Sequence, residues 1–184
     1  MANKLNVNPT RQELLKLKVK LKTAQRGHKL LKEKRDGLMK NFMAIIRQAK
    51  TLREQIEKEL GQGFFSFIFA ASKMRQTEID EALLVPTKKV SLEATTKNVM
   101  GVEVPEFDYQ EEGDFLCYDL ATTSTSLDGA LQTFSDALKS MIKLAEIEHS
   151  AKLLAAEIEK TRRRVNALEY VFIPDMAETI KYIT

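Results

Sequence analysis

The sequence has few of the residues that form disulfides, metal centres and tight turns. Its 184 residues include one cysteine (Cys117), two histidines, seven glycines and four prolines, and no tryptophan. A single cysteine excludes a disulfide framework within the chain and suits a reducing compartment. His28 and His149 have no second histidine or cysteine at ligand spacing, so we expect no metal site. The scarcity of glycine and proline favours long helices.

Long apolar runs are also absent. The longest run, residues 64–71, is interrupted by Ser66 and is much shorter than the roughly 20 residues of a membrane span. Residues 1–8 are polar, and no apolar stretch typical of a secretory signal follows them. We therefore expect a cytoplasmic chain without direct membrane insertion, although it could attach to a membrane complex.

Motifs for enzymatic chemistry are missing as well. No Gly-x4-Gly-Lys-Ser/Thr loop is present to bind phosphates. Gly27 and Lys29 lie within a heptad pattern, where a helical glycine is expected to permit close approach of a neighbouring helix. Paired carboxylates such as Glu157 and Glu159 are interpreted as solvated helix charges. We predict no catalytic residues, no cofactor and no enzymatic activity in this chain itself.

Charge is unevenly distributed along the chain, whose net charge is +3. Residues 1–60 hold 16 bases and 6 acids, whereas residues 61–125 hold 5 bases and 11 acids. Residues 126–184 are nearly balanced, with 8 bases and 9 acids. The beginning of the sequence is therefore basic and its middle is acidic.

Apolar residues recur at alternating spacings of three and four in the first third of the chain. Only His28 and Arg35 are polar among the thirteen positions, which we call the first seam. They are Leu14, Leu17, Leu21, Ala24, His28, Leu31, Arg35, Leu38, Phe42, Ile45, Ala49, Leu52 and Ile56. Six heptads predict a coiled-coil helix, with a length on the order of 75 Å at about 1.5 Å per residue.

The start of this helix has two candidate signals. Thr10 and Glu13 have the spacing of a capping box, in which each side chain binds the other residue's backbone N–H. Alternatively, Pro9 could be the first helical residue behind Asn8.

A second seam follows near the end of the chain, with Thr161 as its only polar member. It comprises Leu144, Ile147, Ala151, Leu154, Ile158, Thr161, Val165, Leu168 and Phe172. Ser124 or Ser126 could cap this helix, and Asp128 would add favourable charge to its first turn. Pro174 should kink the helix or start a new turn.

Two seams separated by a middle segment predict a mainly α fold, a long antiparallel two-helix coiled-coil hairpin. The alternative is a parallel dimer in which each helix packs on another chain, but a partner within the chain has the higher effective concentration. The predicted divisions are a first coiled-coil helix over residues 1–60, a middle segment over 61–125 and a second coiled-coil helix over 126–184.

The middle segment combines a small helical insert with a short β-hairpin. Gly61 and Gly63 weaken the first helix, but residues 64–84 remain compatible with a helix. Apolar residues then alternate with polar ones on both sides of residues 95–98, which favour a turn. These alternating residues are Val90, Leu92, Ala94, Val102 and Val104. Residues 106–125 are acidic and are interpreted as a loop, anchored by Phe107, Tyr109, Phe115 and Tyr118.

The basic residues allow three interpretations. Residues 11–35 hold ten bases and two acids, and Arg162, Arg163 and Arg164 follow in the second helix. They could be solvated faces of the coiled coil, a nucleic-acid-binding arm, or a cationic shaft seated in a protein collar. Nucleic-acid binding would favour base-stacking aromatics, which are few in the basic region. Arginine suits a collar because it forms directional bonds to carboxylates and carbonyls.

These basic stretches resemble the D subunit of the V-type and A-type ATPases. The amino-terminal motif is residues 8–11 with 26–36, and the carboxy-terminal motif is residues 157–170, continued by 173–174 and 179–183. The match is looser across the middle. Members of the family usually continue beyond the position of Thr184 with a further charged helical stretch.

The resemblance implies the central rotor shaft of a rotary ATPase, with an antiparallel helical hairpin and a small β-hairpin. Such a shaft couples ATP hydrolysis or synthesis in the head to H+ or Na+ transport. Its paired terminal helices enter a ring of catalytic and non-catalytic subunits, its central region binds the F subunit, and its far end reaches the membrane rotor ring through a socket subunit. The complex would lie in the cytoplasm at the cell membrane, without nucleic acid.

Two sets of candidate contact residues follow. For contact with the head or for register of the shaft, the candidates are Arg26, Lys34, Arg35, Arg162, Arg163 and Arg164, and an acid on the second helix is expected to pair with Arg35. For contact with the F subunit or the socket, the candidates are Val90, Leu92, Val102 and Val104. Two alternatives remain at this point, a basic arm that binds nucleic acid and a scaffold that dimerises through its seams.

Overall fold

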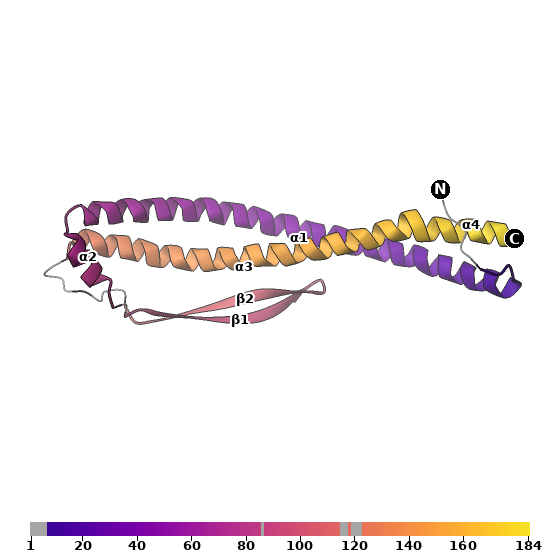
Figure 1. Ribbon diagram of the computed structural model, residues 1–184, viewed down its shortest axis with the longest axis horizontal. Helices are drawn as coiled ribbons and strands as arrows, with labels where there is room; N and C mark the ends of the chain where they lie inside the picture. Colours follow the sequence, from indigo (N-terminus) through magenta and orange to yellow (C-terminus); the bar gives the residue numbers. More distant parts are fainter. Residues whose placement is uncertain (1–6, 86, 115–117, 119–122) are drawn as a thin grey trace. The chain divides into compact units, whose positions relative to one another are not determined.

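The computed structural model describes residues 7–85, 87–114, 118 and 123–184. Its elements are α1 (Arg11–Ala71), α2 (Gln76–Ala82), β1 (Lys89–Val99), β2 (Val102–Glu112), α3 (Thr125–Ala167), the π-helical turn η1 (Leu168–Phe172) and α4 (Ile173–Ile183) (Figure 1). The prediction of a mainly α chain with one antiparallel β-hairpin is confirmed.

The chain divides into two compact units, and α1 and α3 contribute to both. The first unit combines the chain up to Met43 with Lys152–Thr184, and the second is Ala44–Ala151. The proposed division at residues 60 and 125 stays a prediction, but α1 itself continues past Leu60 to Ala71.

Thr10 caps the start of α1, and Pro9 precedes the helix. The backbone N–H of Glu13 donates to Thr10 Oγ1 at 3.3 Å, and the N–H of Leu14 donates to the Thr10 carbonyl at 3.0 Å. The N–H of Thr10 donates to the carbonyl of Asn8 at 2.8 Å, while the Glu13 carboxylate binds Lys16 Nζ at 2.8 Å, so the second half of the capping box is replaced by these contacts. Lys16 lowers the pKa of Glu13, first through this hydrogen bond.

Ser124, rather than Ser126, caps α3. The N–H of Leu127 donates to the Ser124 carbonyl at 2.8 Å, and the Ser124 hydroxyl lies 3.4 Å from the N–H of Ser126. Asp128 lies in the first turn as predicted, where the positive end of the helix dipole stabilises its negative charge. Its carboxylate also accepts a hydrogen bond from the Tyr118 hydroxyl at 2.5 Å. The predicted anchor Phe115 lies outside the described residues.

The first seam forms the inward face of α1. All thirteen of its residues are buried or half-buried, and Leu38 is fully buried. In the first unit, the facing helix contributes the buried side chains of Leu154 and Val165. Burying each such aliphatic side chain contributes about 1.5–3 kcal/mol to the stability of the folded state.

The helices of the first unit run antiparallel within one chain. His28 lies 3.4 Å from Glu169, while Lys34, further along α1, lies 3.5 Å from Glu157, which is earlier in the sequence. These contacts agree with the predicted antiparallel hairpin, and they do not require a second chain to cover the seams.

The second seam is inward as predicted from Leu144 to Leu168, but the assignment of Phe172 to it is wrong. Phe172 is 54% exposed, and the inward face of α4 is formed by Ile173, Met176, Ile180 and Ile183 together with the buried Thr179. Between Leu168 and Ile173 the spacing is five residues instead of four. The seam therefore shifts by one residue at η1.

Two local features explain this shift. A seam without it would place Asp175 and Tyr182 inward, whereas the shifted seam uses isoleucine and methionine. In addition, Pro174 has no backbone N–H to donate, and its ring would clash with the preceding turn of a regular helix. The N–H of Ile173 instead donates to the carbonyl of Leu168, five residues back. The prediction that the helix changes at Pro174 is therefore correct.

In the second unit, Gly63 allows an aromatic ring to approach α1 closely. A Cβ atom on Gly63 would lie 3.1 Å from the ring of Phe134 on α3, and Phe64 and Phe67 contact that ring edge-on, with centroid distances of 5.3 and 6.5 Å. The expectation of a close helix contact at Gly27 is wrong, since a Cβ atom there would meet nothing within 4 Å.

The β-hairpin turns at Met100 and Gly101, not at residues 95–98. Both turn residues have positive φ, 54° and 84°, which glycine adopts freely and which suits a tight two-residue hairpin turn. Thr95 and Thr96 are β-branched and lie within β1, where they pair with Glu106 and Pro105. The interpretation of residues 106–112 as loop is therefore wrong, because they form most of β2.

A network of charged groups joins the open end of the hairpin to α3. Glu111 on β2 lies 2.8 Å from Lys88 Nζ and 2.9 Å from Lys139 Nζ, and Lys88 also donates to the hydroxyl of Ser135 at 2.5 Å. Nearer the turn of the hairpin, the N–H of Phe107 on β2 donates to the carboxylate of Glu146 at 3.2 Å. The inward residues of β2 are buried or half-buried, whereas nearly all of β1 is exposed.

The network strongly favours the ionised form of Glu111. The nearby groups of Lys88, Tyr109 and Lys139, in that order, lower the pKa of Glu111 to about 2. Burial raises the pKa of Tyr109 to about 12, and the neighbouring Glu111 carboxylate adds to this effect. At the open end of the hairpin, one carboxylate and two ammonium groups thus contribute to its attachment to α3.

Acid should release this attachment. Because the pKa of Glu111 falls from an ordinary 4.5 to about 2 in the folded chain, its stabilising effect is complete above pH 4.5 and is lost as the pH falls towards 2. We expect amide protection in β1 and β2, corrected for intrinsic exchange, to fall over this range. Glu111→Gln should remove the protection already at pH 6, whereas the exposed neighbour Glu112→Gln should behave as wild type. Full protection in Glu111→Gln at pH 6 would contradict the assignment.

The shift at η1 predicts which single-residue deletion the chain tolerates. With Pro174→Ala as the common background, deleting Val171 restores a continuous α-helical seam from Leu168 to Ile173, so the thermal midpoint followed by circular dichroism should hardly change. Deleting the exposed Ala156 in the same background rotates the helix that follows, so its seam residues no longer face α1. That deletion should lower the midpoint by on the order of 10 °C. Equal losses in both variants would contradict the shift.

Candidate interaction surfaces

The first unit carries most of the positive charge. Its two segments, residues 1–43 and 152–184, hold 18 bases and 8 acids. The predicted contact residues Arg26, Arg162, Arg163 and Arg164 are all exposed there. Exposed guanidinium groups suit a partner that supplies carboxylates or carbonyls.

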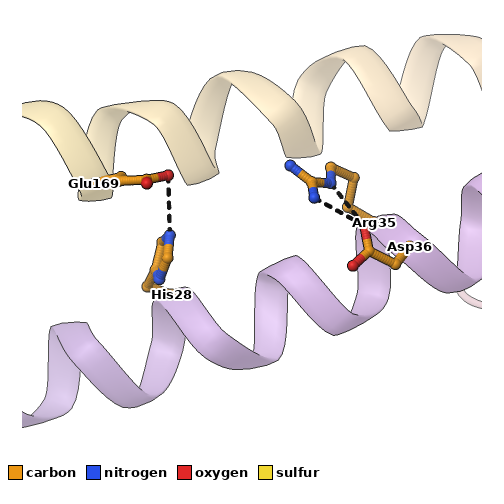
Figure 2. A network of polar contacts seen from close by, with 4 residues as sticks. All are labelled: His28, Arg35, Asp36 and Glu169. Carbon is orange, nitrogen blue, oxygen red and sulfur yellow. Dashed lines mark hydrogen bonds and ion pairs between the residues drawn. The ribbon is translucent and has the colours of Figure 1, made fainter.

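Arg35 lies at the seam, but the prediction of an acidic partner on the second helix is wrong. Its Nε and Nη2 atoms donate to Asp36 on the same helix, at 3.0 and 2.8 Å (Figure 2). The half-buried side chain thereby keeps its long apolar stem near the seam while its charge is paired at the edge. Arg35 and Arg162 line one shallow groove, together with Phe42 and Ile158, so two predicted site residues meet there.

Lys34 and Arg163 already have acidic neighbours. Lys34 forms an ion pair with Glu157 on the facing helix, and Arg163 pairs with Glu159 one turn before it on α3. Lys34 therefore joins the two helices, whereas Arg163 remains on the outer surface. Arg163 and Arg164 line a second shallow groove with Lys160.

His28 also contacts the facing segment across the seam. Its ring points from α1 to Glu169 on η1, with 3.4 Å between Nε2 and Oε2 (Figure 2). A polar residue at one seam position specifies which residues face it across a coiled coil. Among the described residues, no group of three or more histidine, cysteine or acidic side chains could hold a metal ion.

The four predicted contact residues on the β-hairpin differ in exposure. Val90 and Leu92 on β1 are 43% and 48% exposed, and they lie on the same face because strand residues alternate. Val102 is half-buried and Val104 is only 6% exposed, so Val104 serves the packing of the hairpin and is not available to a partner.

Sequence reasoning missed two exposed apolar surfaces. The first is a set of exposed apolar residues on the last turns of α1 and after α2, which we together call the end surface and which comprises Phe64, Phe65, Ile68, Phe69, Leu83, Leu84 and Val85. Its signal was the apolar run at residues 64–71, which has side chains all around the helix. The second is formed by Tyr170, Val171 and Phe172 on η1. The sequence pattern did not predict this surface, because it assigned Phe172 to the inward seam, which shifts by one residue at η1.

The described residues carry several open surface grooves. Their grooves are open and shallow, and the charged groups within them are paired or solvated. Among the described segments, no helix is both long and apolar enough to cross a membrane.

Comparison with known proteins places the chain in a family. The family model for the ATP synthase D subunit matches residues 13–184. The V-type ATP synthase D subunit of Clostridioides difficile is 53% identical over 183 residues, covering 98% of this chain and 82% of that protein. The V-type ATP synthase D subunit of a Thermoanaerobacter species is 50% identical, covering 98% of this chain and 87% of that protein. The V-type ATP synthase D subunit of Acetivibrio thermocellus is 49% identical, covering 98% of this chain and 83% of that protein.

These similarities extend over both helices and the segment between them, and they give no support to the alternative of a nucleic-acid-binding arm. The chain belongs to the ATP synthase D subunit family, and it is a central-stalk component of a rotary ATPase.

Proposed function

We propose that this central-stalk component works as a non-catalytic rotor shaft, which transmits conformational change between an ATP-hydrolysing head and a membrane rotor. The observation that carries the proposal is the paired-helix seam of the first unit, with its cross-helix contacts His28–Glu169 and Lys34–Glu157. Separating the helices would expose a continuous apolar stripe, so the pair resists splaying under load.

The shaft transmits force without bond chemistry of its own. A pair of helices has no threefold symmetry, so three identical catalytic sites around it would meet different faces. Each nucleotide-binding event then favours the orientation of the shaft that its own site binds best, which is differential binding between states. The charged surface of the first unit supports this role, since its exposed arginines can form directional bonds to a partner.

The two units suggest different partners. The basic first unit suits the catalytic and non-catalytic subunits of the head, because its charge complements carboxylates and Arg26, Arg162, Arg163 and Arg164 are exposed. The second unit suits the F subunit and a socket subunit on the rotor ring. The exposed end surface, rich in phenylalanine, supports this assignment because apolar patches of this kind mark protein contacts. The chain would act in the cytoplasm, at the periphery of the membrane.

Co-purification with a tagged catalytic head tests the proposal. We expect one copy of the chain per head, and we expect the rate of ATP hydrolysis to change when the chain is present. The chain by itself should show no hydrolysis. Failure of the chain to bind an intact head, or binding without any effect on turnover, would contradict the rotor-shaft function.

The exposed face of β1 should contribute to a contact with the F subunit or the socket. Replacing both Val90 and Leu92 by serine should weaken capture of one of these partners about tenfold or more, because apolar contact area is lost. The thermal midpoint should stay near that of wild type, since both side chains are already exposed. Ser91→Ala with Glu93→Gln, on the opposite face of β1, provides the matched control. Undiminished capture of both partners would remove the hairpin from the contact.

A further inference from the structure

The turn η1 presents three consecutive large apolar side chains to solvent. Tyr170, Val171 and Phe172 are 71%, 49% and 54% exposed, so the described part of the first unit leaves them largely uncovered. Two of the three are aromatic. We call these three residues the η1 knob. Single exposed apolar residues are common on protein surfaces, but a run of three at a helix irregularity requires an explanation.

The position of the knob follows from the shift in the seam. If the helix were regular through η1, the spacing of the second seam would bring Phe172 inward, as the sequence pattern predicted. The shift gives that inward place to Ile173 and leaves Phe172 outside. Single π-helical turns within α-helices are rare and occur frequently at functional sites.

The η1 knob is held in place from the opposite side. Glu169, the residue before the knob, lies against His28 on α1, and the N–H of Ile173 closes the turn on the Leu168 carbonyl. Contacts on both flanks thus fix the turn, so the knob is presented by an ordered backbone. Ordered aromatic side chains lose little conformational entropy on binding, which favours their use at the centre of interfaces.

The outer face of α3 leads directly to the knob. Arg163, Asn166 and Tyr170 follow one another at spacings of three and four and are all exposed, so they share one face of the helix. Arg162 and Arg164 flank that face. Tyrosine, phenylalanine and arginine are the residues enriched in the buried centres of protein interfaces, whereas lysine and acidic residues are depleted there. The combination is therefore typical of a protein contact.

We propose that the η1 knob is a docking element for the head of the ATPase, inserted into an apolar patch of the surrounding collar whose carboxylates or carbonyls receive Arg162, Arg163 and Arg164. This inference rests on the proposed function, and it adds a specific contact that the seam pattern of the sequence does not reveal. The excess of 18 bases over 8 acids in the first unit supports an electronegative collar as the occupant. A second copy of this basic unit would be repelled.

The test replaces Tyr170, Val171 and Phe172 by serine together and measures capture of the intact tagged head and its ATP hydrolysis. We expect capture to weaken at least tenfold, while the thermal midpoint of the free chain stays unchanged because the three side chains are exposed. Phe65→Ser with Leu84→Ser, at similarly exposed positions of the second unit, is the matched control and should leave head capture unchanged.

The outcomes separate this inference from the proposed function. If wild type fails to bind the head, the proposed function fails. If wild type binds and the triple variant binds equally well, only the docking knob is wrong. A lower thermal midpoint in the triple variant would show that the residues serve the fold and would also overturn the inference. Mass measurement of the free chain adds one more outcome, since a dimer abolished by the triple variant would assign the knob to a second copy.

Discussion

Both units depend on keeping the apolar stripe of α1 against an antiparallel partner helix. All thirteen positions of the first seam are buried or half-buried, although α1 also displays many charged groups. The stripe determines which faces of α1 and α3 remain outside, and hence where arginines can reach a partner. It also explains the turn η1, because continuity of the apolar contact takes precedence over regular helical hydrogen bonding.

Polar groups at the edges of the seams give the helices a defined register. A uniform apolar stripe would tolerate sliding, whereas His28 opposite Glu169 and Lys34 opposite Glu157 favour one alignment. The hairpin in the second unit follows the same rule, since apolar residues of β2 supply contact area while Glu111, Lys88 and Lys139 specify its position on α3. In both units, apolar area supplies stability and paired charges supply specificity.

The sequence was sufficient to predict the helices, their antiparallel pairing and the presence of a hairpin, because these depend on periodic patterns. It was insufficient where one local feature competes with a pattern. The turn at Met100 and Gly101 depends on positive φ, and Arg35 found its partner in the adjacent Asp36 instead of across the seam. Among the candidate contact residues, the exposure of Arg26 and of residues 162–164 follows from their places outside the seams, whereas the burial of Val104 depends on how the hairpin packs.

The turn η1 also has a consequence for variation among related chains. Each residue added to an α-helix rotates everything beyond it by about 100°. The five-residue turn η1 absorbs such an addition locally. The same face of α4 therefore stays against α1, while different side chains become exposed to solvent. For a component that rotates among its neighbours, angular phase matters as much as distance. At η1 the chain can change which side chains it exposes without rotating α4 about the helix axis.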